Sequence, residues 1–532
     1  MGLCGAISYI ISNIGAGLFI TPTSVLEQVD SVGLSLIIWS VAALISLLGA
    51  FCYVELGTSI RRSGADFAYL CYVKWYPIAF AFMCVGCFVV FPATLAIQAE
   101  TFSEYLIKGF RIQIFEDTNK FYLKKLIGFS LLWLLMMLNF FSLKIFVSRF
   151  QIVASLAKII TTAIIICTGF YFLIFKGETQ NLQNIMEGTQ VRPSHIRAAL
   201  FAGLFSYDGW DVLNFGTEEI EKPKRTMPLA IIVGMSLVAF IFLATNISFF
   251  VVLGIDQMKS SVAVADTFAT AKLDKFYSVL PFLICILLIG SMNTSLFCAS
   301  RYLLVAARQG HLPAFLSCSN TEHNSPRVAI FISVTLSFLL SFTGNLSQLI
   351  NCVSFCQWLQ RIFTMLVLLW IRFHNKSIHP DAIQNPIIMP IVFMIICATL
   401  VMTTVIADTH MCSIGGSVAL GGLVFYFLFF YTHSPSAIKG IKTFGCNANN
   451  KITIYTQIVF NVMPPEFSEE ITRSYQVNLS PTSKVNGNTD SITKFESIRT
   501  ETLKNNAVSQ QFSEEKSKSI IIGSNNGMKD IG

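Results

Sequence analysis

The chain has 532 residues, of which 54% are hydrophobic and only 13% are charged, and its mean hydropathy is +0.63. Soluble domains carry about 25% charged residues, so the composition excludes an ordinary water-soluble globule. The net charge of +7 is spread over loops and a polar C-terminal segment. No basic face with interleaved aromatic residues indicates nucleic-acid binding. Most of the 14 cysteines lie inside apolar runs, which argues against a disulfide framework.

Apolar segments recur along the whole chain, and a membrane helix needs about 20 such residues. Six segments contain no Asp, Glu, Lys or Arg, namely 1–26, 31–54, 75–99, 126–143, 230–254 and 276–300. Gly344 and Asn345 divide the uncharged run 328–360 into a span near 327–343 and another that starts near 347. Four further spans complete the set, at 150–175, 196–217, 387–409 and 413–432. The prediction is an all-α membrane protein with twelve transmembrane helices.

The even number of spans places both termini on one side of the membrane. Slightly more Lys and Arg residues fall in the loops of that side, which predicts cytosolic termini. A cleaved signal peptide within 1–26 would need a basic start, but no Lys or Arg precedes Arg61. Residues 434–532 are rich in Ser, Thr, Asn and Lys, so we expect a mostly disordered cytosolic tail.

The first predicted span contains residues that disfavour a continuous helix. Gly15 and Gly17 flank Ala16, and Pro22 follows. Both Gly and Pro lower the stability of a helix interior. One interpretation is that the glycines allow two helices to pack closely. The other is that the helix is interrupted here and exposes unpaired backbone groups.

The sixth predicted span carries a polar cluster near its middle. Ser206, Tyr207, Asp208 and Gly209 interrupt the apolar run 196–217. An Asp at the bilayer centre costs about 2.5–3.5 kcal/mol on insertion scales, so the Asp208 carboxylate is expected to face protein or water. A second interrupted helix is therefore predicted.

The two breaks open two blocks of five spans, residues 1–175 and 176–376, and residues 377–433 hold two further spans. Because five is odd, the second block enters the membrane from the opposite face, as in transporters built from inverted repeats. Unpaired N–H groups at a half-helix N-terminus suit a carboxylate, and unpaired carbonyls suit an ammonium. An amino acid carries both groups, so the breaks predict an amino-acid site.

Several segments match one known family. They are ISNIGAGLFITPTSVLE in the first span, FAGLFSYDGWDVLNFGTEEIEKPKRTMPLAI in the sixth, and GSMNTSLFCASRYLLVAARQGHLP at 290–313. On these residues the chain resembles the light subunits of heteromeric amino-acid transporters, in the L-type family of the amino acid–polyamine–organocation (APC) superfamily. It looks most like the branch that exchanges dibasic amino acids and cystine for neutral ones. The resemblance covers Met1 to about Glu466 and implies a LeuT-like fold, a 5+5 inverted repeat plus two C-terminal helices.

The resemblance also implies which residues bind substrate. Backbone groups of the first break would hold the carboxylate, carbonyls of the sixth-span break would hold the α-amino group, and Phe205 would gate the pocket. The implied substrate-binding residues are Ile14, Gly15, Ala16, Gly17, Phe205, Ser206, Tyr207, Asp208, Gly209 and Asp211. No cofactor or metal is expected.

Lys158 in the fifth span matches a family lysine whose ammonium stands where sodium-coupled relatives of this fold hold Na⁺. The resemblance therefore implies exchange without sodium. The other interpretation is that Lys158 snorkels to the cytosolic interface.

Three charged side chains in predicted spans call for partners. Asp208 and Asp211 lie within about one turn of each other, and two carboxylates there would favour a Lys, Arg or ornithine substrate over an acidic one. Alternatively, Asp211 caps the half-helix that follows the break. Arg361 lies inside the tenth span, where an Arg usually lines a path or pairs with an acid. Asp408 and Glu100 are its candidate partners.

Family light subunits usually join a single-span glycoprotein heavy subunit through a Cys between spans three and four. The corresponding segment here, KGFRIQIFEDTNKFYLKK at 108–125, contains no Cys. Cys412 is a poor substitute because it lies at a span boundary. Either a heavy subunit binds non-covalently or the chain works alone.

Other classes of protein are less well supported. No His-Glu-x-x-His, Gly-x-Ser-x-Gly or Walker A motif indicates an enzyme, and no continuous polar ring indicates a channel. The expectation is a sodium-independent exchanger of neutral and cationic L-amino acids in the plasma membrane, working by alternating access. A non-transporting amino-acid sensor and a uniporter of the cationic amino-acid transporter type remain alternatives.

Overall fold

A computed structural model describes residues 17–463 with short gaps, together with Leu3, Ala6, Ile7 and Ile10. The gaps fall at 62–63, 113–116, 142–143, 262, 274–276, 309–310, 321–324, 375–377, 408 and 430–437. Residues 1–465 form one compact unit.

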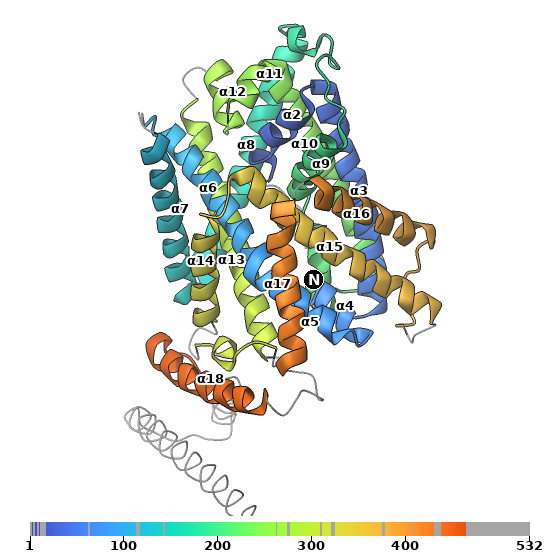
Figure 1. Cartoon of the computed structure of the whole chain (residues 1–532). Helices are drawn as coiled ribbons and strands as arrows, with labels where there is room; N and C mark the ends of the chain where they lie inside the picture. The colour runs from blue at the N-terminus through green and yellow to red at the C-terminus, as the bar shows by residue number, and fades with distance from the viewer. Residues whose placement is uncertain are drawn as a thin grey trace, which may run out of the picture. The chain divides into compact units, whose positions relative to one another are not determined.

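Helices make up nearly all of the regular structure in the described residues (Figure 1). They are α2 (Pro22–Val29), α3 (Val32–Ser59), α4 (Ala65–Tyr72), α5 (Tyr76–Val85), α6 (Phe91–Gly109), α7 (Asp117–Phe140), α8 (Lys144–Ile174), α9 (Pro193–Ser206), α10 (Pro223–Val252), α11 (Ile255–Lys259), α12 (Val264–Lys272), α13 (Val279–Arg308), α14 (Arg327–Leu340), α15 (Leu346–Phe373), α16 (Ile388–Ala407), α17 (Thr409–Phe429) and α18 (Ile438–Phe460). Four short 3-10 helices are described, η1 (Gly17–Phe19), η3 (Gln180–Leu182), η4 (Val212–Glu219) and η6 (Ala314–Ser317). A π-helical turn, η2 (Gly86–Val90), connects α5 to α6. Ser319 and Met463 form an isolated antiparallel bridge.

Eight of these helical segments are long and apolar enough to cross a membrane, which confirms a multi-pass membrane protein. They are Val32–Ser59, Tyr76–Gly109, Thr118–Phe140, Val153–Ile174, Pro223–Val252, Val279–Arg308, Leu346–Phe373 and Ile388–Ile406. Two shorter apolar helices cover Arg327–Leu340 and Ser413–Leu428.

Local sequence signals explain where several helices begin. Pro22, Pro193 and Pro223 stand at the start of α2, α9 and α10, where a missing N–H costs no intrahelical bond. The N–H of Asn345 donates to Gln348 Oε1 at 2.9 Å and so caps α15. The predicted division of the run 328–360 is confirmed, because α14 ends at Leu340 and α15 begins at Leu346.

The structure corrects the predicted start of the fourth span. Helix α6 ends at Gly109 and helix α7 begins at Asp117, not near residue 126, so most of the predicted loop 108–125 is helical. Lysines at the start of α7 are paired with glutamates of α6, as described below. These ion pairs let a charged segment continue as helix along the neighbouring helix.

A second difference lies in the predicted disordered tail. Residues Ile438–Phe460 form helix α18, which packs against η6 and α14. Arg327 Nη1 donates to Phe460 O at 2.9 Å, and Asn449 Oδ1 accepts from the N–H of Ala314 at 3.0 Å. These hydrogen bonds hold α18 against its neighbours, and the composition of the segment does not reveal them. The tail beyond 463 lies outside the described residues.

Helix α9 lies at the centre of the contacts that build the site. It packs against α2, α3, α15 and α16, and Figure 1 shows α15 running obliquely past it. Beside it, Trp39 of α3 meets Phe242 of α10 edge to face, with ring centroids 5.7 Å apart. A buried aromatic layer thus supports the segment that carries the sixth-span break.

Candidate functional site

The predicted break in the sixth span is confirmed. Helix α9 ends at Ser206, a turn covers residues 207–211, and η4 begins at Val212. Gly209 has φ +102°, a conformation that favours glycine over residues with a side chain. Among the described residues, no backbone N–H donates to the carbonyl oxygens of Ser206 or Tyr207. Two polar acceptors are therefore available at this turn.

The first span is also irregular where the structure describes it. Gly17–Phe19 form a single tight turn, and α2 starts only at Pro22. The carbonyl of Gly17 accepts hydrogen bonds from the N–H groups of Ile20 and Thr21, at 2.9 and 3.0 Å. Residues 11–16 lie outside the described part, so the predicted roles of Ile14, Gly15 and Ala16 stay predictions.

The two irregular segments touch each other. The hydroxyl oxygens of Thr21 and Ser206 are 2.5 Å apart. A Cβ on Gly17 would lie 2.9 Å from Ser206 Cβ and 2.8 Å from Ser206 Oγ, both closer than real contacts allow. A side chain at position 17 would therefore push the segments apart. The sequence predicts that both breaks lie at one site, and in the structure Gly17 and Ser206 are in contact; binding of a substrate there stays a prediction.

The aromatic residues of the second break face different surroundings. Phe205 is half-buried, whereas Tyr207 is fully buried. The Tyr207 ring lies 4.9 Å from that of Phe242 and 6.0 Å from that of Trp39. The side chain of Tyr207 thus belongs to the aromatic layer, and only its backbone is left to contact a substrate. The gating role of Phe205 stays a prediction.

Asp208 makes a direct ion pair with Arg361 of α15. Arg361 Nη2 donates to Asp208 Oδ1 at 2.7 Å, and Gln357 Nε2 donates to Oδ2 at 2.8 Å. The side chain of Arg361 is 5% exposed, while that of Asp208 is 29% exposed. The pair joins the sixth-span break to the middle of α15.

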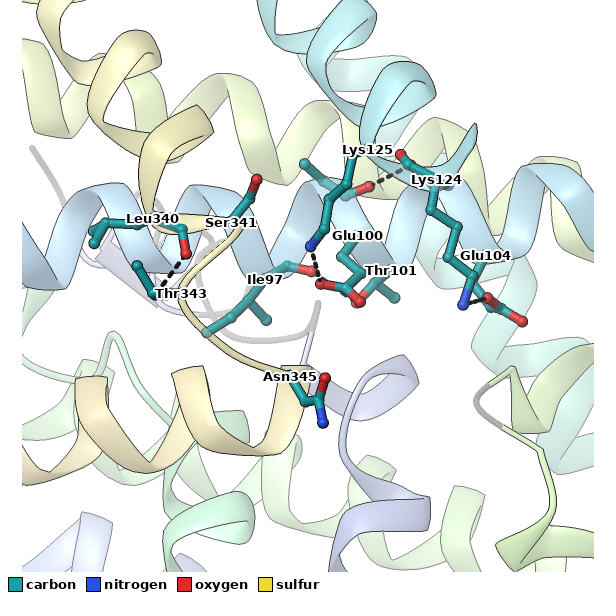
Figure 2. A network of polar contacts seen from close by, with 12 residues as sticks. Ile97, Glu100, Thr101, Glu104, Lys124, Lys125, Leu340, Ser341, Thr343 and Asn345 are labelled. Atoms are coloured by element: carbon teal, nitrogen blue, oxygen red, sulfur yellow. Dashed lines mark hydrogen bonds and ion pairs between the residues drawn. The ribbon is translucent and has the colours of Figure 1, made fainter. Parts of the chain in front are cut away.

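Of the two partners suggested for Arg361 from the sequence, Glu100 needs correction and Asp408 is not tested. Glu100 accepts a 3.0 Å hydrogen bond from Lys125 Nζ, and Asp408 lies outside the described residues. Figure 2 shows Glu100 and Glu104 of α6 facing Lys125 and Lys124 of α7, respectively. Asp208 is the acid that pairs with Arg361, 153 positions away in the sequence.

Asp211 stands at the residue before η4, where the sequence offered a capping role. Its side chain makes no capping hydrogen bond, although its carbonyl accepts from the N–H of Asn214 at 2.8 Å. The carboxylate instead interacts electrostatically with Asp208 and Arg361. The capping interpretation is wrong.

Sequence reasoning missed a polar cluster behind the break. Asp66 of α4 accepts hydrogen bonds from Tyr53 and, at 2.7 Å, from Thr364 Oγ1. Tyr69 donates to Asn214 Oδ1 at 2.9 Å and ties the resumed half of the sixth span to α4. Asp66 lies in the first turn of a short helix, where an acidic residue is common, so the sequence gives no signal that its carboxylate is half-buried and paired.

Lys158 lies on α8 and is half-buried. Helix α8 packs against α10 and α13. The predicted approach of the ammonium to the first break involves residues 11–16, so it falls outside the described part. The described residues also contain no group of three or more His, Cys, Asp or Glu side chains placed to hold a metal.

Comparison with known proteins gives consistent matches. The family model described as amino acid permease matches residues 2–435. The chain is 52% identical to amino acid transporter protein 6 of Caenorhabditis elegans over 471 residues, which cover 88% of this chain and 90% of that protein. It is 33% identical to the human cystine/glutamate transporter, with coverages of 87% and 90%. It is also 33% identical to human b(0,+)-type amino acid transporter 1, with coverages of 88% and 94%.

Proposed function

The chain belongs to the amino acid permease family and is an amino-acid transporter, and we propose that it works as a sodium-independent exchanger of L-amino acids in the plasma membrane. Exchange would proceed by alternating access, with the substrate held between the first and sixth spans. Neutral amino acids are the proposed substrates, and cationic ones are considered in the next section.

One observation carries this proposal: Gly17 and Thr21 lie directly against Ser206. The contact brings the irregular first span to the free carbonyls at Ser206 and Tyr207. N–H groups at the start of a half-helix attract a carboxylate, and free carbonyls attract an ammonium. An α-amino acid fits between groups of these two kinds.

Twelve spans and the inverted repeat form part of the proposal. The eight long helices and the two shorter apolar helices of the described residues would make twelve spans together with the interrupted first and sixth spans. Residues 1–175 and 176–376 would be the two repeats of five spans, followed by the last two spans in residues 377–433. Both termini would face the cytosol, as the loop charges indicate.

Independence from sodium rests on Lys158. Its ammonium would stand where related folds hold Na⁺, so the bound amino acid would need no cation to accompany it. No cofactor or metal takes part in this scheme.

A single-span glycoprotein heavy subunit is the proposed partner, bound without a disulfide. The segment between α6 and α7 contains no Cys, so the usual covalent link has no residue to form it. Packing in the membrane and at the extracellular ends of the helices would then hold the complex together.

The test is uptake of labelled leucine by purified protein in sodium-free proteoliposomes. Unlabelled leucine inside the vesicles is expected to accelerate uptake, and empty vesicles are expected to slow it. Equal uptake with and without internal amino acid would indicate a uniporter. Binding of leucine without any flux would indicate a sensor.

A further inference from the structure

Two donors on one face of α15 occupy the carboxylate of Asp208. Gln357 and Arg361 are four positions apart, so their side chains extend from the same side of the helix. Each donates to a different oxygen of Asp208, at 2.8 and 2.7 Å. Neither oxygen is left without a donor from the chain itself.

Aromatic rings hold the guanidinium in this position. The Arg361 Cζ atom lies 4.7 Å from the ring centroid of Trp210 and 4.7 Å from that of Trp358. Both rings are almost fully buried. Cation–π contacts strengthen when the cation is removed from water, so Arg361 is fixed beside the break and is not free to snorkel.

The guanidinium balances more than one acid. Asp211 lies three residues after Asp208 and interacts electrostatically with Arg361. Asp208 remains partly exposed, with 29% of its side chain accessible, although Tyr207 and Trp210 close to it in the chain are buried. The ion pair therefore borders space that a ligand at the break can reach.

We propose that Arg361 is a specificity-determining residue: it is a built-in cation that occupies Asp208 and restricts transport to amino acids with uncharged side chains. This rests on the function proposed above, and it narrows the substrate class of the same site. The expectation that Asp208 and Asp211 select cationic substrates is replaced by selection of neutral ones.

The physical reason is the cost of an unpaired buried charge. A Lys or Arg substrate would have to compete with Arg361 for Asp208, and weakening that ion pair would leave the buried guanidinium without its hydrogen-bonded carboxylate. An acidic substrate would meet the carboxylates of Asp208 and Asp211, and like charges repel. A neutral side chain disturbs neither interaction.

The decisive variant is Arg361→Gln, which keeps a polar side chain but removes the cation. Asp208 would then be free for a substrate ammonium or guanidinium. We expect the ratio of arginine uptake to leucine uptake to rise by about tenfold or more. The double variant D208N/R361Q carries neither charge, and its ratio is expected to return to that of the unmodified protein.

A matched control lies on the same helix. Arg372 also pairs with a buried carboxylate, that of Glu55, and its Nε donates at 2.6 Å. R372Q removes a half-buried cation of α15 that takes no part in either break, so its uptake ratio is expected to stay unchanged. An equal change of selectivity in R372Q and R361Q would overturn the proposal.

The unmodified protein provides a test that needs no variant. Excess arginine is expected to inhibit leucine uptake about tenfold or more weakly than excess methionine does. Equal inhibition by the two would overturn the proposal, even if R361Q does not reach the membrane. No uptake of any amino acid would instead contradict the proposed function, so the two failures are distinguishable.

Discussion

At the scale of single residues, Gly17 shows how one missing side chain permits a site. Any Cβ at this position would collide with Ser206, so glycine is required where the first and sixth spans meet. The sequence indicated this glycine as one of several that disfavour a helix. It could not tell close packing from an interrupted helix, and the structure shows both features at the same residue.

Replacement of Gly17 by valine is expected to abolish leucine uptake, because the side chain would separate the two breaks. The measurement is initial uptake normalised to the amount of protein in the vesicles. Gly254→Ala is the matched control, since a Cβ at Gly254 meets no atom within 4 Å. Uptake by G17V at the level of G254A would contradict the assigned role.

Ion pairs with a buried member and ion pairs at the surface contribute differently to the stability of the protein. Glu55 accepts from Arg372 Nε at 2.6 Å and from the N–H of Asn385 at 3.1 Å. Removing one member of such a pair costs about 3–5 kcal/mol, because the other charge stays buried without a partner. Exposed pairs contribute about 0–1 kcal/mol, and the pair of Arg61 and Asp381 is of this kind.

We therefore expect Arg372→Met to lower the unfolding temperature of the detergent-solubilised protein markedly, and Arg61→Met to change it little. The double variant E55Q/R372M is expected to recover part of the loss, since no unpaired charge remains. Equal shifts for R372M and R61M would show that burial of the pair has no bearing on its energy.

At the scale of elements, the sequence predicted what local patterns encode. Long apolar runs identified the spanning helices, and Gly209 next to Asp208 identified the sixth-span break. The early start of α7 was hidden, because its lysines are matched by glutamates on another helix. The pairing of Asp208 with Arg361 was hidden for the same reason: it depends on how α9 and α15 pack.

Helix α18 is the clearest element that composition could not predict. Its average polarity suggested disorder, but Arg327 binds both Phe460 O at 2.9 Å and Phe140 O at 3.1 Å and so joins three elements. The ring of Phe460 also lies 5.4 Å from that of Phe331. Docking of α18 therefore depends on specific contacts with η6 and with the ends of α7 and α14.

The variant Arg327→Ala is expected to loosen α18 without unfolding the membrane helices. Hydrogen exchange of peptides covering 438–460 is expected to become faster, while exchange in α3 and α13 stays the same. Lys451→Ala serves as the control, because Lys451 is exposed on α18. Unchanged exchange of α18 in R327A would contradict the proposed docking contacts.

At the scale of the whole molecule, two irregular segments meet inside an otherwise helical membrane protein, and we propose that they hold the amino acid. The supporting helices fix the breaks from several directions: α3 and α10 through buried aromatic rings, and α15 through Arg361. The family assignment agrees with this arrangement but does not specify side-chain selectivity. In this account that selectivity follows from the charge balance around Asp208.

The most direct test is an experimental structure of the purified protein with leucine bound. The account predicts the carboxylate of leucine beside the backbone N–H groups near Gly17 and its ammonium beside the carbonyls of Ser206 and Tyr207. The same structure is expected to keep Arg361 on Asp208. Leucine bound away from both breaks, or a first span that continues as an unbroken helix past Gly17, would contradict it.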